Sequence, residues 1–299
     1  MSGRFAPTPS ADLHLGNLRT ALVSWLAARS TGRDWLVRIE DLDLPRLPEA
    51  DAIAARHLAD LATLGLVPDG VVVRQSGRTA LYEAAFDRLD GAVYECFCSR
   101  KDVAEATRAP HGTTPRYPGT CRSLGEAAKA ELRRTRPPAW RVDARAVTVT
   151  VTDRLHGPYT GVVDDFVVRR ADGVFAYNFA VVVDDGLQGV DQVVRGDDLL
   201  ESAPRQAWLA GRLGFTVPEY LHVPLVLAPD GTRLAKRDRA GSLAGLAAAG
   251  LDAGTVLAHL AASLGLAAAG EAVTLAGLTA RFDPARLPLR PWYTDPAAW

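Results

Sequence analysis

The most constraining feature of the chain is its N-terminus, where a short strand passes through a proline-rich turn directly into a helix. Gly3 to Pro7 is the predicted strand, and the turn continues to His-Leu-Gly-Asn at residues 14–17. Apolar residues then recur at helical spacing as far as Gly32, a residue that favours a helix end. Such a helix aims unpaired N–H groups and a positive dipole end at whatever lies over it. The N-terminus therefore predicts an anion site within an α/β fold.

Strand and helix signals continue to alternate along the chain. Strands are expected at residues 34–39, ending on acidic residues, and at 71–74, and helices at 48–64 and 80–89. This alternation is typical of a doubly wound parallel sheet. We expect residues 1–93 to form the first half of one Rossmann-like domain.

Residues 94–145 break the alternation and are predicted to be an insertion, since they hold all three cysteines and one short helix at 124–134. Residues 146–240 are expected to complete the Rossmann-like domain. Valine alternates with threonine at 147–151, which is typical of a half-exposed antiparallel strand. Buried strands are expected at 165–169 and 180–183.

A helix is predicted to open at Asp198, where Asp-x-x-Glu, with Glu201 reaching back, resembles a capping box. Residues 241–299 are predicted to form a C-terminal region that is helical and rich in alanine and leucine to about residue 280, followed by an irregular tail.

The composition excludes several classes of protein. The 34 basic and 35 acidic residues give a net charge of −1, so a nucleic-acid partner would need a local basic patch. Three cysteines with C-x-C spacing argue against a secreted disulfide framework. The N-terminus lacks a basic and apolar leader, and Asp252 and His259 interrupt the alanine-rich run. We expect a cytoplasmic monomer that does not contact a membrane.

Two segments carry candidate nucleotide chemistry. His14 can donate to a phosphate oxygen, Gly16 allows close backbone approach, and Asn17 opens the helix. Lys236, one of only three lysines, lies in Arg-Leu-Ala-Lys-Arg at 233–237, where it can neutralise a leaving pyrophosphate. The alternatives are a loop capped by Asn17 with a solvent-facing histidine, and an ordinary exposed basic loop.

Together these segments resemble the class I aminoacyl-tRNA synthetases. RFAPTPSADLHLGN is similar to the glutamyl form of their HIGH motif, and RLAKR to their KMSKS loop. Four further motifs match the glutamyl branch in order: RIEDLD, QSGR, VVVDD and VVRGDDLLESAPRQ, which begin at residues 38, 75, 181 and 193. The resemblance covers residues 3–240 and implies the class I Rossmann-like (HUP) parallel sheet.

Within that branch the chain resembles the truncated glutamyl-Q paralogues. It stops soon after the KMSKS-like loop, which leaves no room for an anticodon-binding domain, and C-x-C precedes Tyr117-x-x-x-Cys121. The resemblance implies ATP-dependent activation of L-glutamate and its transfer to the queuosine base at the wobble position of tRNA(Asp). The alternatives are a glutamyl-tRNA synthetase that charges a tRNA 3′ end and a non-catalytic tRNA-binding relic.

The resemblance also assigns site residues. It implies that Glu40 binds the glutamate ammonium group, that Tyr177 and Arg195 bind glutamate, and that the preceding turn does so through Arg4, Phe5, Ala6, Pro7 and Thr8. ATP, with magnesium, would be held by His14, Gly16, Asn17 and Lys236, of which His14, Asn17 and Lys236 are the catalytic candidates. Charge logic agrees for three of these residues, because two carboxylates and one amine require two cations and one anion: Arg4, Arg195 and Glu40.

A structural zinc ion is the expected cofactor of the insertion. Cys96, Cys98 and Cys121 supply three thiolates, and zinc favours four ligands. The resemblance recommends Tyr117 as the fourth, whereas ligand preference alone favours His111. The alternative is three small buried thiols.

The chain also departs from the family pattern. Ala11 stands where glycine is usual, Ala235 stands where serine is usual, and Asn17 replaces the final histidine of the HIGH motif. These changes are expected to lower the activation rate, but they remove no charged group.

Overall fold

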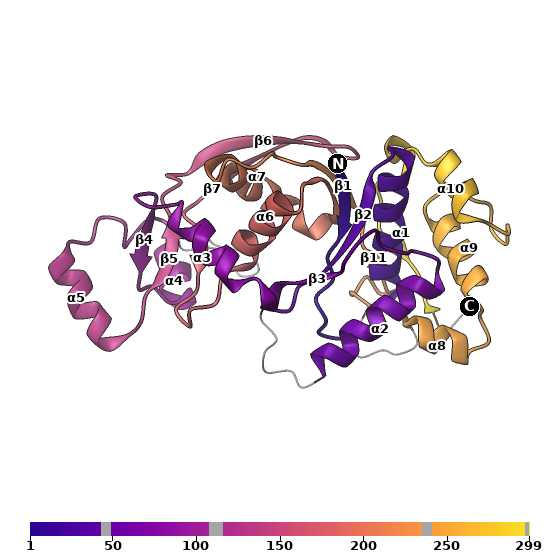
Figure 1. Cartoon of the computed structure of the whole chain (residues 1–299), viewed down its shortest axis with the longest axis horizontal. Helices are drawn as coiled ribbons and strands as arrows, with labels where there is room; N and C mark the ends of the chain where they lie inside the picture. The colour runs from indigo at the N-terminus through magenta and orange to yellow at the C-terminus, as the bar shows by residue number, and fades with distance from the viewer. Residues whose placement is uncertain (43–48, 108–115, 235–240, 297–298) are drawn as a thin grey trace.

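The computed structural model describes residues 1–42, 49–107, 116–234, 241–296 and 299. The molecule is elongated, with the parallel sheet in the middle, β4, β5 and α5 at one end and α9 and α10 at the other (Figure 1). In the described part of the chain, no helix is both long and apolar enough to cross a lipid bilayer.

The central sheet contains seven strands in the order β3-β2-β1-β9-β10-β6-β7. All neighbouring strands are parallel except β6 and β7, which form an antiparallel pair. The predicted parallel α/β fold and the antiparallel strand at 147–151 are therefore confirmed. The strands span Ser2–Phe5 (β1), Asp34–Ile39 (β2), Val73–Arg74 (β3), Val147–Asp153 (β6), Gly157–Val163 (β7), Val190–Gly196 (β9) and Glu219–Val223 (β10).

Helix α1 (Leu15–Ser30) is buried around most of its surface, because it lies between the sheet and the C-terminal helices (Figure 1). Those helices are α8 (Leu243–Ala248), α9 (Ala253–Ser263) and α10 (Leu275–Arg281). Each begins at a side chain that accepts a backbone N–H, and the three caps are Ser242, Asp252 and Thr274. These caps divide the predicted alanine-rich helical region into separate helices.

Outside the insertion, the described part of the chain also contains the helices α2 (Ala50–Thr63), α3 (Thr79–Asp87), α6 (Tyr177–Leu187) and α7 (Ala203–Arg212), with short 3₁₀ turns at Gln75–Gly77 and Asp197–Ser202. The strand predicted at 180–183 is wrong, because these residues belong to α6. A short apolar run has the same pattern in a buried strand as in a buried helix, and residues 179–185 of α6 are all buried.

Two further local predictions are wrong. Asp198 does not open a helix with a capping box, since it lies inside the 3₁₀ turn and pairs with Arg233. The strand at 71–74 is only β3, and the Val71 side chain is 87% exposed.

The insertion contains α4 (Arg100–Thr107) and α5 (Glu126–Thr135), and it shares an antiparallel sheet, in the order β4-β5-β8, with a strand from the following segment. The strands of this sheet are Val93–Cys96, Ala139–Val142 and Val167–Arg169, so the strand predicted at 165–169 pairs here and not in the main sheet. The division at residues 93, 145 and 240 stays a prediction.

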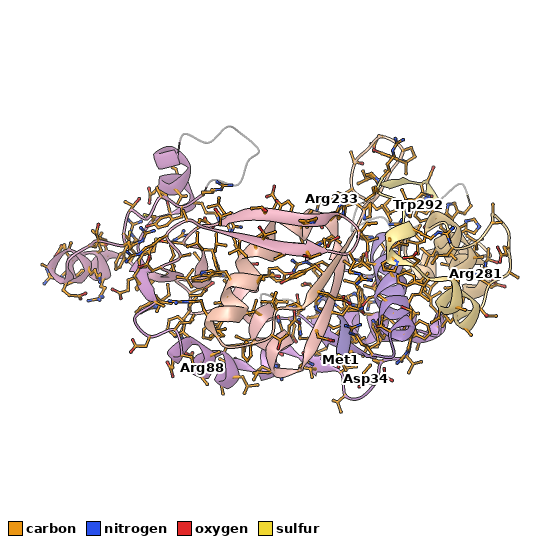
Figure 2. The ribbon with its side chains drawn as sticks, turned by 90° about the horizontal axis from the view of Figure 1, so that it is seen from above. Met1, Asp34, Arg88, Arg233, Arg281 and Trp292 are labelled. Carbon is orange, nitrogen blue, oxygen red and sulfur yellow. The ribbon has the colours of Figure 1, made fainter. Side chains whose placement is uncertain are left out.

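The C-terminal tail, predicted to be irregular, contains a 3₁₀ turn at Pro284–Arg286 and the strand β12 (Trp292–Tyr293), which pairs with β11 (Val226–Leu227). Seen from above, Arg233 and Trp292 lie on the side of the molecule opposite Met1 and Asp34, where β1 and β2 begin (Figure 2). Through the pairing of β12 with β11, the tail holds the segment that leads into the KMSKS-like loop.

Candidate functional site

A cavity of about 520 Å³ lies where β1, β2 and β9 end. Ligands of open α/β sheets bind at this carboxyl edge. Almost all the predicted binding residues line the cavity: Arg4, Phe5, Ala6, Pro7, Thr8, His14, Gly16, Asn17, Glu40, Tyr177 and Arg195. Residues far apart in the sequence thus meet at one site.

His14 is the N-cap of α1, a role that the sequence alternative gave to Asn17. Its Nδ1 accepts from the backbone N–H groups of Gly16 and Asn17 at 3.0 and 3.4 Å, and the Asn17 side chain accepts from the His14 backbone at 3.2 Å. An accepting Nδ1 places the proton of the neutral ring on Nε2. The backbone N–H groups of Gly16 and Asn17, which were expected to face an anion, therefore donate to His14 Nδ1. This cap orients the Nε2–H of the histidine ring as a donor in their place.

Gly16 is needed for this cap. A Cβ at position 16 would lie 2.9 Å from Cε1 of His14, closer than real Cβ contacts come, and 3.0 Å from Nδ1, which is tighter than most of them. The glycine thus makes room for the histidine ring, and its predicted close approach to a ligand stays a prediction, since Gly16 also lines the cavity.

Below the cavity, arginines and carboxylates form a buried network. Asp185 accepts from Arg4 at 3.3 Å through both carboxylate oxygens and lies 2.8 Å from Arg38 Nη1. Arg38 also contacts Glu40 at 3.2 Å and Asp184 at 3.5 Å. Arg38 on β2 and Glu40, one residue beyond its end, lie on the same side, since side chains two residues apart in extended backbone point the same way. The network fixes Arg4 and Glu40 at the cavity wall.

Burial and pairing act in opposite directions on these charges. Burial raises the pKa of Glu40, although Arg38 and Arg4 oppose the shift. Burial also disfavours the charge of Asp185, yet the two arginines hold the pKa of that carboxyl below its usual range. A further cation, such as a ligand ammonium beside Glu40, would relieve the cost of its charge.

The KMSKS-like segment is described only in part. Lys236 and Ala235 lie outside the described residues. Arg233, which lines the cavity, pairs with Asp198 at 3.1 Å and so ties the start of this segment to the turn after β9. Because the Arg233 side chain is 70% exposed, this pair contributes little to stability.

Ala11 does not strain the turn. Among the described non-glycine residues, a positive φ occurs only at Arg145 and Ala146, so alanine serves where the family has glycine. The Ala11 carbonyl lies 2.7 Å from Nε2 of the buried His57 on α2, which holds the turn in place.

Asp60 lies one helical turn after His57 on α2, and its pKa predicts how the stability of the fold depends on pH. Burial and repulsion by Asp12 raise the pKa of Asp60 to about 6, and Arg56 offsets only part of the shift. The folded state thus carries this charge at a cost when the pH exceeds the folded pKa. We expect Asp60→Asn to stabilise the fold by about 1 kcal/mol at pH 7.5, after allowing for solvent screening.

As the pH falls through the folded pKa of Asp60, the folded state takes up the proton first, so the penalty fades and is gone below about pH 4. Urea unfolding of both proteins at pH 7.5 and pH 4 measures this. A gain that does not change between the two pH values would contradict the assigned cause.

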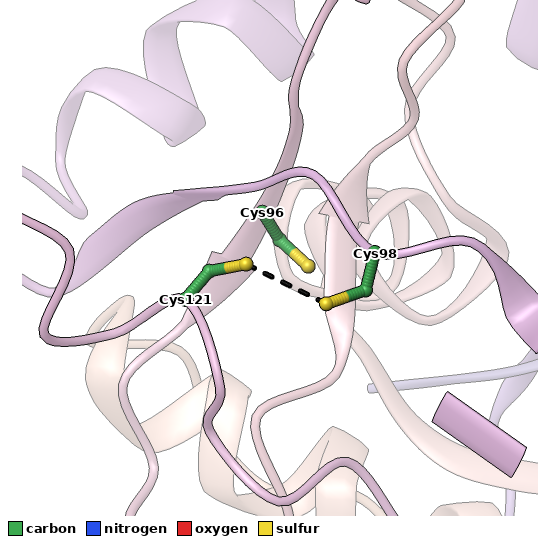
Figure 3. A group of neighbouring side chains, drawn as sticks. All are labelled: Cys96, Cys98 and Cys121. Atoms are coloured by element: carbon green, nitrogen blue, oxygen red, sulfur yellow. Dashed lines mark hydrogen bonds between the residues drawn. The ribbon is translucent and has the colours of Figure 1, made fainter. Parts of the chain in front are cut away.

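The cysteine cluster lies in the insertion, away from the cavity. The Sγ atoms of Cys96, Cys98 and Cys121 all lie within 4.8 Å of one another and point to a common centre (Figure 3). The Tyr117 hydroxyl is 3.4 Å from the Cys96 sulfur and 3.7 Å from the Cys98 sulfur. Three predicted ligands and the tyrosine are therefore together, whereas His111 lies outside the described residues.

These residues fit a tetrahedral metal ion. Zn–S bonds of about 2.3 Å separate two sulfurs by roughly 3.8 Å, and Cys98 and Cys121 are 3.5 Å apart. Arg141 donates to the Cys96 sulfur at 3.2 Å and covers the Tyr117 ring at 3.8 Å, so a cation offsets the negative ligand set. Such an ion would be structural, holding β4 to the loop around Cys121.

We expect one zinc ion per chain in the wild-type protein and nearly none in Cys98→Ser. Zinc in such a site prefers sulfur ligands, and the serine replaces one thiolate by a hydroxyl oxygen. Metal analysis of the purified protein after dialysis measures this. Ser99→Ala, which leaves the sulfurs in place, should keep the full zinc content. Zinc that stays bound in Cys98→Ser would contradict this ligand set.

Several residues of the site were not predicted from the sequence. Arg38, Asp184 and Asp185 lie within quoted motifs but were given no role, and the buried His222 and Asp153 carried no motif signal. The alternation along β2 offered one clue, since it places Arg38 beside Glu40.

Comparison with known proteins agrees with the geometry. The family of class I tRNA synthetases (E and Q), catalytic domain, matches residues 1–296. The glutamyl-Q tRNA(Asp) synthetase of Nocardia farcinica is 56% identical, over 97% of this chain and 92% of its own length. The chain belongs to this family of ligases. The glutamyl-Q tRNA(Asp) synthetase of Cutibacterium acnes is 54% identical, over 89% of this chain and 76% of its own length.

A crystal structure of a glutamate tRNA ligase from Elizabethkingia meningosepticum, in complex with its amino acid, has the same fold. It superposes with a TM-score of 0.80 at 25% identity and matches 96% of this chain. The chain spans 65% of the length of that ligase. The resemblance to the glutamyl branch of the class I synthetases is thereby confirmed.

Proposed function

We propose that this synthetase activates L-glutamate with ATP and transfers the glutamyl group to the queuosine base at the wobble position of tRNA(Asp). The observation that carries the proposal is that Arg4, Arg195 and Glu40 all line the cavity. Two cations and one anion complement the two carboxylates and one ammonium of glutamate. The names of the similar proteins support the tRNA acceptor.

In the first step, an oxygen of the glutamate α-carboxylate attacks the α-phosphorus of ATP. The bond from that phosphorus to the pyrophosphate oxygen breaks, which gives glutamyl-adenylate and pyrophosphate. The Nε2–H of His14 is oriented by its cap and would stabilise charge on the transferring phosphoryl group. Asn17 holds the histidine backbone, and Lys236 would neutralise the leaving pyrophosphate, whose phosphates magnesium accompanies.

In the second step, a hydroxyl of the queuosine ring attacks the activated carbonyl and AMP leaves. Tyr177 stands at the N-terminus of α6 on the cavity wall and would contact glutamate. Zinc at Cys96, Cys98, Tyr117 and Cys121 would stabilise the insertion and take no part in either step. We also expect the enzyme to act as a monomer in the cytoplasm.

Glutamate-dependent exchange of label between pyrophosphate and ATP tests the first step. Exchange with glutamate, but not with glutamine or aspartate, supports the proposal. No exchange at high enzyme concentration would favour a non-catalytic tRNA-binding relic.

Mapping of labelled glutamate tests the acceptor. Total tRNA with and without queuosine is incubated with enzyme, ATP and labelled glutamate, then digested with a guanosine-specific ribonuclease. We expect label on the anticodon fragment, and only when queuosine is present. Label on the 3′-terminal fragment would instead identify an ordinary glutamyl-tRNA synthetase.

A further inference from the structure

A chain of buried polar side chains stands behind Arg195. It begins at Asp153 on β6, passes through His222 on β10 and ends at Arg195 on β9, three neighbouring strands of the sheet. Asp153 Oδ2 lies 2.7 Å from His222 Nδ1, and His222 Nε2 lies 2.9 Å from Arg195 Nε. The sheet register places His222 directly opposite Arg195. Asp153 and His222 are almost fully buried, and neither lines the cavity.

The hydrogen bonds among Asp153, His222 and Arg195 allow only one arrangement of protons. A guanidinium N–H donates and never accepts, so His222 Nε2 must be the acceptor. Its proton then lies on Nδ1 and is donated to Asp153. Burial lowers the pKa of His222, which keeps the ring neutral near pH 7. The carboxylate itself is held in place by the backbone N–H groups of Leu155, His156 and His222, each at 2.9 Å.

The other contacts of Arg195 leave a defined pair of donors. One N–H of Nη1 donates to Gln206 Oε1 at 2.6 Å, and one N–H of Nη2 donates to the Leu199 carbonyl at 3.2 Å. Together with Nε, these contacts use three of the five N–H groups of the guanidinium. One N–H remains on each terminal nitrogen, and two such N–H groups can act as a fork that binds a carboxylate through both oxygens.

We propose that Asp153 and His222 are positioning residues that hold the Arg195 fork toward a substrate carboxylate. The proposal rests on the glutamate-binding role of Arg195 given under Proposed function. Asp153 selects the histidine tautomer that can accept from Arg195, and the histidine fixes the guanidinium through Nε. An arginine already held by three contacts loses little side-chain entropy when the carboxylate arrives, so the fork binds more tightly.

Three substitutions separate this role from a merely structural one. His222→Gln can place an amide oxygen near the Nε2 position and keep the acceptor for Arg195. His222→Asn can keep a donor near the Nδ1 position for Asp153 but loses that acceptor. Asp153→Asn presents an amide to Nδ1, which favours the tautomer with its proton on Nε2, facing the Arg195 donor.

Pyrophosphate exchange gives the KM of each variant for glutamate and for ATP. We expect His222→Asn and Asp153→Asn to raise the KM for glutamate at least 10-fold, with the KM for ATP within about 2-fold of wild type. His222→Gln should stay within about 3-fold for both substrates. An unchanged glutamate KM in His222→Asn, or equal losses for both substrates in all three variants, would overturn the positioning role.

Thermal unfolding of each variant and the ring ¹⁵N spectrum of the wild-type enzyme complete the test. A spectrum with the His222 proton on Nδ1 supports the positioning role. A proton on Nε2 would overturn that role independently of any activity measurement. If the wild-type enzyme shows no glutamate-dependent exchange, the proposed function fails, and with it the substrate of the fork. Exchange in the wild type with unchanged variants overturns this inference alone.

Discussion

Replacement of Arg38 by methionine is expected to lower the free energy of unfolding by about 3–5 kcal/mol, because it leaves buried carboxylates without their shared cation. The Arg38 side chain is fully buried and contacts Glu40, Asp184 and Asp185. Although burial opposes its charge, these three carboxylates raise the pKa of Arg38. Methionine fills much of the volume but offers no donor, so the loss is electrostatic and not a cavity effect.

Denaturant unfolding of the purified variant measures this change. Arg134→Met is the matched control, since Arg134 pairs with Glu131 on the surface of α5, where both side chains are mostly exposed. An exposed pair of this kind is worth about 0–1 kcal/mol. If the two variants lost similar stability, the Arg38 network would not hold the site together as described.

The sequence identified most of the cavity because its signals were local. The proline-rich turn, the helix after His14 and the acidic end of β2 each follow from the types and spacing of neighbouring residues. The resemblance to the glutamyl branch, with which the charges agree, grouped Arg4, Glu40 and Arg195 at one site. The roles of individual residues stay proposals until substitutions test them.

The rest of the site depends on which strands become neighbours, and composition carries no signal for that. Asp153 and His222 are 69 residues apart and meet only because β6 pairs with β10. The cap formed by His14 was missed because histidine is an uncommon N-cap, and Asn17 satisfied the usual preference. The helix α6 was partly mistaken for a strand because a helix buried on most sides loses its amphipathic period.

Glu40→Gln is expected to reduce kcat/KM for glutamate at least 10²-fold in pyrophosphate exchange, while the KM for ATP changes less than about 3-fold. The glutamine keeps the size of the side chain and an oxygen for the Arg38 contact, which is 3.2 Å in the wild-type protein. What it loses is the negative charge that would pair with the substrate ammonium. A factor of 10² corresponds to about 2.7 kcal/mol, within the range for one partner of a buried charge pair.

The neighbouring carboxylate provides the control. Asp41 is also buried, but it contacts Arg74 and Ser76 and does not line the cavity, so Asp41→Asn should leave the glutamate KM unchanged. The pH profile gives an independent measure. Burial raises the pKa of Glu40, so kcat/KM for glutamate in the wild-type enzyme should fall as the pH decreases and Glu40 takes up a proton, a limb that Glu40→Gln removes. Equal losses in both variants, or a limb that survives in Glu40→Gln, would assign the ammonium contact to another group.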